Sequence, residues 1–256
     1  YAWGYFGYGA PAAYVPRDYA AEKPQAYQAF LGHVKSGKDG AEVSLSDGMC
    51  RDQHVGDLLS CLESWLNREF GPPATSGCPW RLGQFDLRRN QLSDESLVRV
   101  FERLKQLDVR IRRLFVDSNA GGQASVTAMV DYVWNCPEAI SEISFTDNEL
   151  KVDAGAEDDP VSSLLRCLYN HPCYPVKTYS NTPSSGEGKQ EIKVSPVLLR
   201  LGHNLIADGE GLLRRIVERG GSSRIALREA PEPFVAEGAE DLYLAVCLPG
   251  FGQQKS

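Results

Sequence analysis

One pattern of apolar residues that ends in an asparagine occurs four times in this chain. It constrains the fold more than any other feature of the sequence. In each copy an asparagine follows a short apolar pattern, which in the first copy reads Leu82, Phe85 and Leu87. The asparagines are 29, 29 and 56 residues apart: Asn90, Asn119, Asn148 and Asn204. A short strand with one apolar face cannot bury that face alone, so the copies must stack on one another. We predict a repeat protein whose four asparagines are structural, with amides that bond the backbone of the same and the adjacent turn.

After each asparagine the apolar spacing changes from two to about four, which indicates that a strand is followed by a helix. The apolar residues after the first two asparagines fall at identical offsets: Leu97, Phe101 and Leu104, then Val126, Val130 and Val133. Each repeat is therefore predicted to consist of a strand, a loop and a helix.

These aligned copies resemble the leucine-rich repeat family, and the 29-residue period with a full helix is similar to its ribonuclease-inhibitor-like class. The resemblance covers roughly residues 80–230. It implies a curved solenoid with parallel strands on the concave side and helices on the convex side. The expected fold class is α/β: a leucine-rich repeat solenoid with a parallel concave sheet and convex helices, plus a disordered N-terminal tract and capping elements.

The interval of 56 residues is best explained by one repeat that carries an insertion, placed at about residues 171–195. The stretch from Tyr179 to Lys189 has the composition of a flexible loop. Insertions of this length are either functional or merely tolerated, because doubling a loop costs only about 0.6 kcal/mol in closure entropy. We favour the second interpretation.

The regions outside the repeats differ in composition. Residues 1–29 are rich in tyrosine and glycine and are expected to be disordered. Residues 30–79 are expected to form a hairpin and a capping helix that covers the open edge of the first repeat. Residues 225–227 are interpreted as a degenerate fifth strand, and residues 231–256 as a C-terminal cap and tail. Within the latter, residues 241–248 are expected to form either the last strand or a cap. Because residue 1 is tyrosine, we expect a fragment or a processed product.

Seven scattered cysteines favour reduced thiols and an intracellular location, in the cytoplasm or the nucleus. Two Cys–His pairs have helical spacing, Cys50 with His54 and Cys167 with His171, and Cys173 lies near the second pair. Each pair supplies only half of a tetrahedral site, so no metal is expected. No cofactor is expected either, and the chain has no apolar run of 18 residues that would span a membrane.

The side chains between the buried strand positions are predicted to form the concave face. The strands offer no nucleophile paired with a base, and no glycine-rich phosphate loop is present, so we do not expect an enzyme. The leading hypothesis is a non-enzymatic scaffold that binds an unknown partner protein through that face. The predicted partner-binding residues are Asp86, Arg88, Phe115, Asp117, Ser144, Thr146, Arg200 and His203.

An alternative is an RNA-associated protein that uses the N-terminal tract and a basic patch. Residues 81–113 hold nine basic and five acidic residues, whereas residues 138–160 hold eight acidic residues and Lys151. This gradient either orients a charged partner or reflects solvated faces. The net charge of −7 argues mildly against RNA.

Overall fold

The computed structural model describes residues 18–72, 79–156, 159–174, 176–180, 191–195, 197–220, 225–227 and 244–247. They form a mixed α/β fold with one large, mostly parallel sheet. The expected α/β class and parallel sheet are therefore confirmed. In spatial order the strands are β1 (Val34–Gly37), β2 (Gly40–Ser44), β3 (Trp80–Asp86), β5 (Arg113–Phe115), β6 (Glu142–Ser144), β10 (Val197–Arg200), β13 (Leu244–Cys247) and β12 (Ile225–Leu227).

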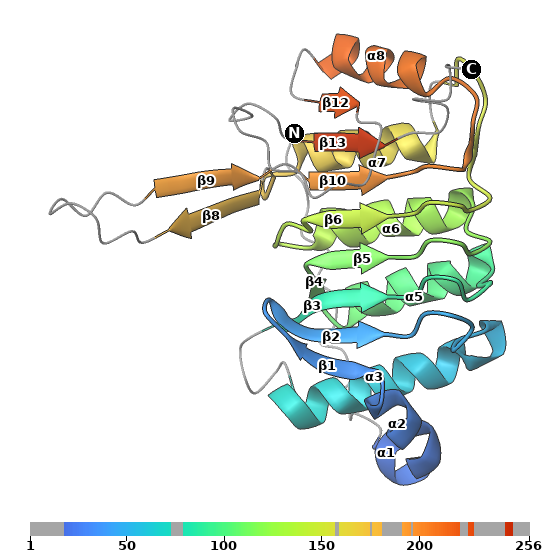
Figure 1. The fold of residues 1–256 in the computed structure, drawn as a ribbon, viewed down its shortest axis with the longest axis vertical. Coiled ribbons are helices and arrows are strands. Elements are labelled where there is room, and N and C mark those ends of the chain that lie inside the picture. The colour runs from blue at the N-terminus through green and yellow to red at the C-terminus, as the bar shows by residue number, and fades with distance from the viewer. Residues whose placement is uncertain are drawn as a thin grey trace, which may run out of the picture.

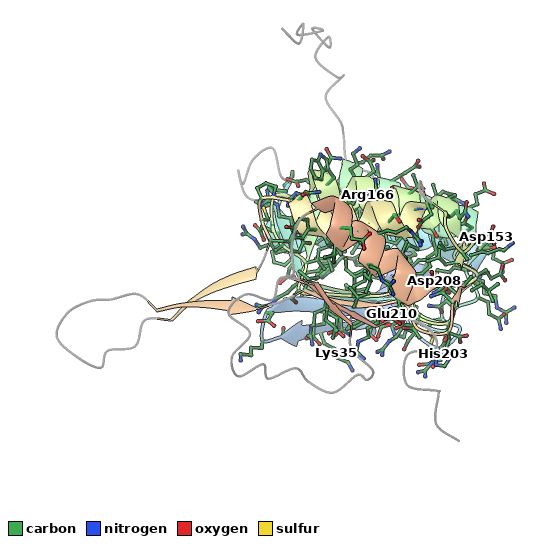
Figure 2. All side chains as sticks on the ribbon, turned by 90° about the horizontal axis from the view of Figure 1, so that it is seen from above. Lys35, Asp153, Arg166, His203, Asp208 and Glu210 are labelled. Atoms are coloured by element: carbon green, nitrogen blue, oxygen red, sulfur yellow. The ribbon has the colours of Figure 1, made fainter. Side chains whose placement is uncertain are left out.

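Four helices follow the four asparagines, as the change of spacing predicts. They are α5 (Asp94–Gln106), α6 (Gln123–Asn135), α7 (Pro160–Asn170) and α8 (Gly209–Gly220). Each helix packs against the next, and together they lie on one side of the sheet (Figures 1 and 2). We call the opposite side of the sheet, toward which Lys35 and His203 lie in Figure 2, the strand face.

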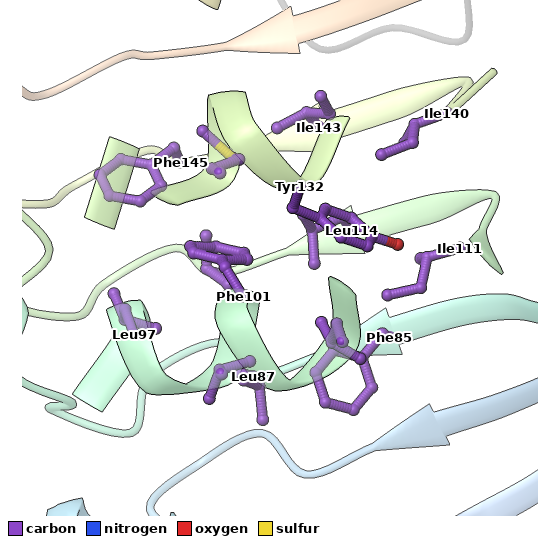
Figure 3. Close-up of a cluster of buried hydrophobic side chains, with 14 of the residues drawn as sticks. Phe85, Leu87, Leu97, Phe101, Ile111, Leu114, Tyr132, Ile140, Ile143 and Phe145 are labelled. Carbon is purple, nitrogen blue, oxygen red and sulfur yellow. The ribbon is translucent and has the colours of Figure 1, made fainter. Parts of the chain in front are cut away.

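The core lies between the sheet and these helices. Strand residues such as Phe85 and Leu114 meet helix residues such as Phe101 and Tyr132 (Figure 3), and all four are almost fully buried. Burial of each large apolar side chain stabilises the fold by about 1.5–3 kcal/mol. The remaining strands are short: β4 (Val109–Ile111) pairs with the start of β3, and β7 (Lys151–Val152) pairs with β11 (Leu205–Ile206).

The asparagines form a buried ladder along the turns, as predicted. Asn119 Oδ1 accepts from the backbone N–H of Leu92 at 2.9 Å, and Asn119 Nδ2 donates to the carbonyls of Val116 at 2.9 Å and Leu87 at 3.0 Å. The amide thus bonds its own turn and the preceding one. The other three asparagines repeat this arrangement: Asn90, Asn148 and Asn204.

The N-terminal region differs from the prediction in two respects. Residues 19–29, which were expected to be disordered, lie in helices α1 (Tyr19–Glu22) and α2 (Pro24–Leu31); residues 1–17 lie outside the described residues. Leu31 therefore belongs to a helix, and the hairpin of β1 and β2 starts only at Val34.

The open edge of the first repeat is covered by two elements rather than by the helix alone. Strand β2 pairs in parallel with β3, so the hairpin supplies hydrogen-bond partners for the backbone groups at the edge of β3. Helix α3 (Val55–Phe70), preceded by the short 3₁₀ helix η1 (Asp52–His54), packs beside α5 and extends the helix layer.

The insertion contains two strands, and the strand order of the C-terminal region differs from expectation. β8 (Val176–Ser180) and β9 (Glu191–Ser195) form an antiparallel pair that projects away from the sheet (Figure 1). Apart from Tyr179 and Ser180 at the end of β8, the predicted flexible loop lies outside the described residues. The predicted fifth strand, β12, does not pair with β10. Instead β13 lies between them, parallel to both.

Candidate functional site

The register of the parallel strands aligns side chains in three rows across the strand face. The first row contains Glu42, Gln84, Arg113, Glu142 and Leu198. The second row contains Ser44, Asp86, Phe115, Ser144 and Arg200. Two residues further along each strand, the third row contains Ser46, Arg88, Asp117, Thr146 and Gly202. The carbonyls of the last four accept hydrogen bonds from backbone N–H groups of the preceding turn. Seven of the eight predicted partner-binding residues fall in the second and third rows.

Asp86, Arg88 and Phe115 form one cluster at the centre of these rows. The Asp86 carboxylate is only 1% exposed and receives a bidentate ion pair from Arg88, with Nε to Oδ1 at 2.9 Å and Nη2 to Oδ2 at 2.6 Å. The Arg88 guanidinium also lies 5.0 Å from the centre of the Phe115 ring. The hydrogen bonds that Arg88 donates to the Asp86 carboxylate raise the pKa of Arg88. These contacts fix a partly exposed cation and an aromatic ring in one geometry.

A second cluster adjoins the first. Asp117 Oδ1 accepts hydrogen bonds from the hydroxyl of Ser144 and from the backbone N–H of Thr146, the latter at 2.7 Å. Ser144 is buried, whereas Asp117 and Thr146 are partly exposed. Ser144 and Asp86 therefore hold their neighbours in place from beneath, while Arg88, Phe115, Asp117 and Thr146 present surface to solvent.

Two ion pairs also lie in these rows, and of their four residues only Arg200 was predicted as a site residue from the sequence. Arg200 bonds Glu142 at 2.9 Å, and Arg113 reaches Glu42 at 2.8 Å. Arg113 precedes Phe115 by two residues, and Glu142 precedes Ser144 by two residues. Extending the alternation of inward and outward side chains by one step toward the N-terminus of each strand would have predicted both. Glu42 had no such signal, because its place depends on the pairing of β2 with β3.

His203 lies apart from the three rows, in the turn that follows β10. It is exposed and has a positive φ of 55°, as do the equivalent residues Arg89 (58°), Ser118 (53°) and Asp147 (55°). Only a few per cent of residues other than glycine adopt this left-handed conformation. The repeated geometry of these turns explains the position of His203, which the structure does not bring close to the Arg88 cluster.

The basic patch at residues 81–113 is largely neutralised by ion pairs. Arg81 and Arg110 both contact Glu138, the second at 2.6 Å, and Arg112 contacts Asp39 at 2.8 Å. A phosphate backbone would have to compete with these carboxylates, which weighs against the RNA hypothesis.

Four cysteines and one histidine of the described part of the chain are buried: Cys50, Cys61, Cys136, Cys167 and His171. Within it, no three His, Cys, Asp or Glu side chains are placed to hold a metal ion. His171 is buried, with Nε2 3.1 Å from the Trp134 carbonyl and Nδ1 accepting from the Cys173 backbone. Burial raises the pKa of Cys50, Cys61 and Cys167 to about 11, and these three thiols are free.

None of the helices that the structure describes combines the length and the hydrophobicity needed to cross a membrane. In comparisons with known proteins, no family model, no curated protein and no solved structure matches this chain.

Proposed function

We propose that this chain is a non-enzymatic protein-binding module of the leucine-rich repeat type, which binds a partner protein through its strand face. The asparagine ladder, the alternation of strand and helix, and the helices gathered on one side of the sheet support the assignment to ribonuclease-inhibitor-like repeats. Such stacked repeats commonly use the strand side as an extended binding surface.

The observation that carries the proposal is the cluster of Asp86, Arg88 and Phe115. Arginine and aromatic residues are enriched among the residues that contribute most to protein interfaces. Here the arginine is held by a buried carboxylate and an aromatic ring before any partner arrives, which lowers the entropic cost of binding. Free, buried cysteines support a location in the reducing cytoplasm or nucleus.

The test removes this cluster without leaving a buried charge unpaired. Replacing Arg88 alone would leave the Asp86 carboxylate buried without its cation, which destabilises a fold. We therefore combine Asp86→Asn, Arg88→Gln and Phe115→Ala, which leaves the net charge unchanged. Affinity purification of the tagged chain, followed by quantitative mass spectrometry, should show partner recovery falling about 30-fold, the loss expected from about 2 kcal/mol of interface energy.

A matched control variant makes the same three kinds of change on the helix side. Lys105→Gln and Asp131→Asn remove an exposed ion pair of 2.6 Å between α5 and α6, and Trp134→Ala removes a side chain that is 54% exposed. This control should retain its partners. If the strand-face variant retains the same partners in the same amounts, the strand face is not the binding site.

A further inference from the structure

A groove of about 450 Å³ lies at the N-terminal end of the molecule, between the hairpin of β1 and β2 and the last turns of α3. Its apolar lining comes from Leu31, Val34, Trp65 and Phe70, and its charged lining from Lys35 and Glu69. The two charges are of opposite sign, so the groove suits an uncharged, apolar occupant.

The groove lies beside an edge of the large sheet. Among the described strands, β1 is paired with β2 alone. An edge strand presents backbone N–H and C=O groups that a second strand can pair with, and proteins commonly cover such an edge. An occupant in extended conformation would therefore gain backbone hydrogen bonds as well as apolar contacts.

Aromatic rings lead from α2 to this groove. The ring centres of Tyr27 and Phe30 are 6.5 Å apart, those of Phe30 and Trp65 are 6.3 Å apart, and those of Trp65 and Phe70 are 5.7 Å apart with nearly perpendicular planes. Phe70 ends the series and is 44% exposed. Another aromatic side chain could extend the series by the same edge-to-face geometry.

The chain itself contains a segment with matching chemistry. Residues 1–17 include six aromatic residues, and their one charged residue is Arg17. This segment joins the described structure at Asp18, whose carboxylate bonds Arg68 at 2.8 Å. Arg68 is two residues from Phe70 in α3, which corresponds to about 3 Å along the helix axis, so the segment joins the structure beside the part of α3 that lines the groove.

We propose that the aromatic residues of the segment 1–9 dock in this groove and run alongside β1. The ten residues from Tyr8 to Asp18 can span up to about 33 Å, which is enough to pass around a helix of about 10–12 Å in diameter. Docking would cover Phe70 and the free edge of β1, and would prevent a second copy of the chain from pairing with that edge. The inference is independent of the function proposed for the strand face.

Photo-cross-linking in the full-length chain tests this docking. Tyr8→p-benzoylphenylalanine places the probe in the segment, and the labelled chain is mixed with an equal amount of the same protein grown on ¹⁵N. Irradiation followed by peptide mapping should give cross-links to residues 34–37 and 65–70 within one chain. Cross-links between light and heavy chains, cross-links to other surfaces, or no cross-link would overturn the proposal.

A pair of variants and a second measurement check the role of Phe70. Phe70→Gln should abolish these cross-links, whereas Trp134→Gln, which alters another exposed aromatic residue, should leave them unchanged. If Phe70→Gln does not fold, hydrogen exchange replaces it as the test. Changing Trp3, Tyr5, Phe6 and Tyr8 to serine should then raise the exchange rate of the β1 amides at least tenfold, and unchanged exchange would equally overturn the proposal.

Discussion

At the scale of single residues, one departure from the repeat pattern is explained by packing. The second copy has Gly121 where the other three copies have the buried residues Leu92, Leu150 and Ile206. A Cβ atom on Gly121 would lie 2.4 Å from Cζ of Phe145 and 2.8 Å from Cδ1 of Leu97. The Phe145 ring, larger than the equivalent residues Leu87, Val116 and Leu201, thus fills the space that a leucine at position 121 would take.

We predict that Gly121→Ala destabilises the protein by about 1–3 kcal/mol, because it overpacks this site. Adding Phe145→Leu should recover most of the loss, since the smaller side chain frees the space. The measurement is the free energy of unfolding in urea for both single variants and the double variant. Additive effects would contradict the direct contact, because residues in contact couple by about 0.5–3 kcal/mol.

At the scale of elements, neighbouring repeats are joined through the starts of their helices. Helix α6 begins after Gly122 and has no side-chain cap of its own. Asp94, in the first turn of α5, supplies one: its carboxylate accepts from the backbone N–H groups of Gly122 at 2.7 Å and Ser125 at 2.8 Å. Asp52 of η1 plays a related role by accepting from the N–H of Ser93 at 2.9 Å, just before α5.

This capping predicts a dependence of stability on pH. Partial burial alone would raise the pKa of Asp94, but the hydrogen bonds from Ser125, Gly122 and Ala124 outweigh burial and lower it. Because the folded pKa lies below the unfolded value of about 3.9, the stabilisation is complete above that value and is lost as pH falls through the folded pKa.

The expected result is that Asp94→Asn destabilises the protein by about 1 kcal/mol at pH 7 and by less at pH 3. Urea unfolding at both pH values measures the difference. A difference between the two proteins that stays constant from pH 7 to pH 3 would show that the charge of Asp94 does not stabilise α6. Glu95→Gln, an exposed change in the same turn, serves as the control.

At the scale of the whole molecule, one sheet and one apolar core connect the N-terminal elements to the repeats. The core runs without interruption from Tyr19 in α1 to Val246 in β13. Cys50 and Cys61 are buried near its N-terminal end, and Cys136 and Cys167 are buried among the later repeats. Because these regions share one core, we expect them to unfold together.

Thiol labelling in urea at pH 8 tests this cooperativity. With a pKa of about 11, only about one in a thousand of the Cys50, Cys61 or Cys167 thiols is a thiolate at this pH, and burial blocks access as well. All four thiols should therefore stay unlabelled in the native protein and react at one urea midpoint, as read by peptide mass spectrometry. Labelling of Cys50 and Cys61 at a lower urea concentration would mean that the N-terminal cap unfolds on its own.

The sequence by itself determined the features that depend on local periodicity. The spacing of apolar residues defined the strands and helices of the repeats, and the asparagines marked the turns whose amide ladder the structure contains. Alternation along each strand also identified Asp86, Arg88 and Phe115 as residues of one face. These predictions succeeded because the repeat period makes each neighbour a copy of the same pattern.

Only the tertiary structure decided the pairings that no period encodes. The placement of β13 between β10 and β12, the pairing of β2 with β3, and the ion pair between Glu42 and Arg113 join residues that are far apart in the chain. Such contacts arise because pairing in space stabilises the backbone groups of strand edges and partly buried charges. The sequence contains those partners, but local patterns do not reveal which ones meet.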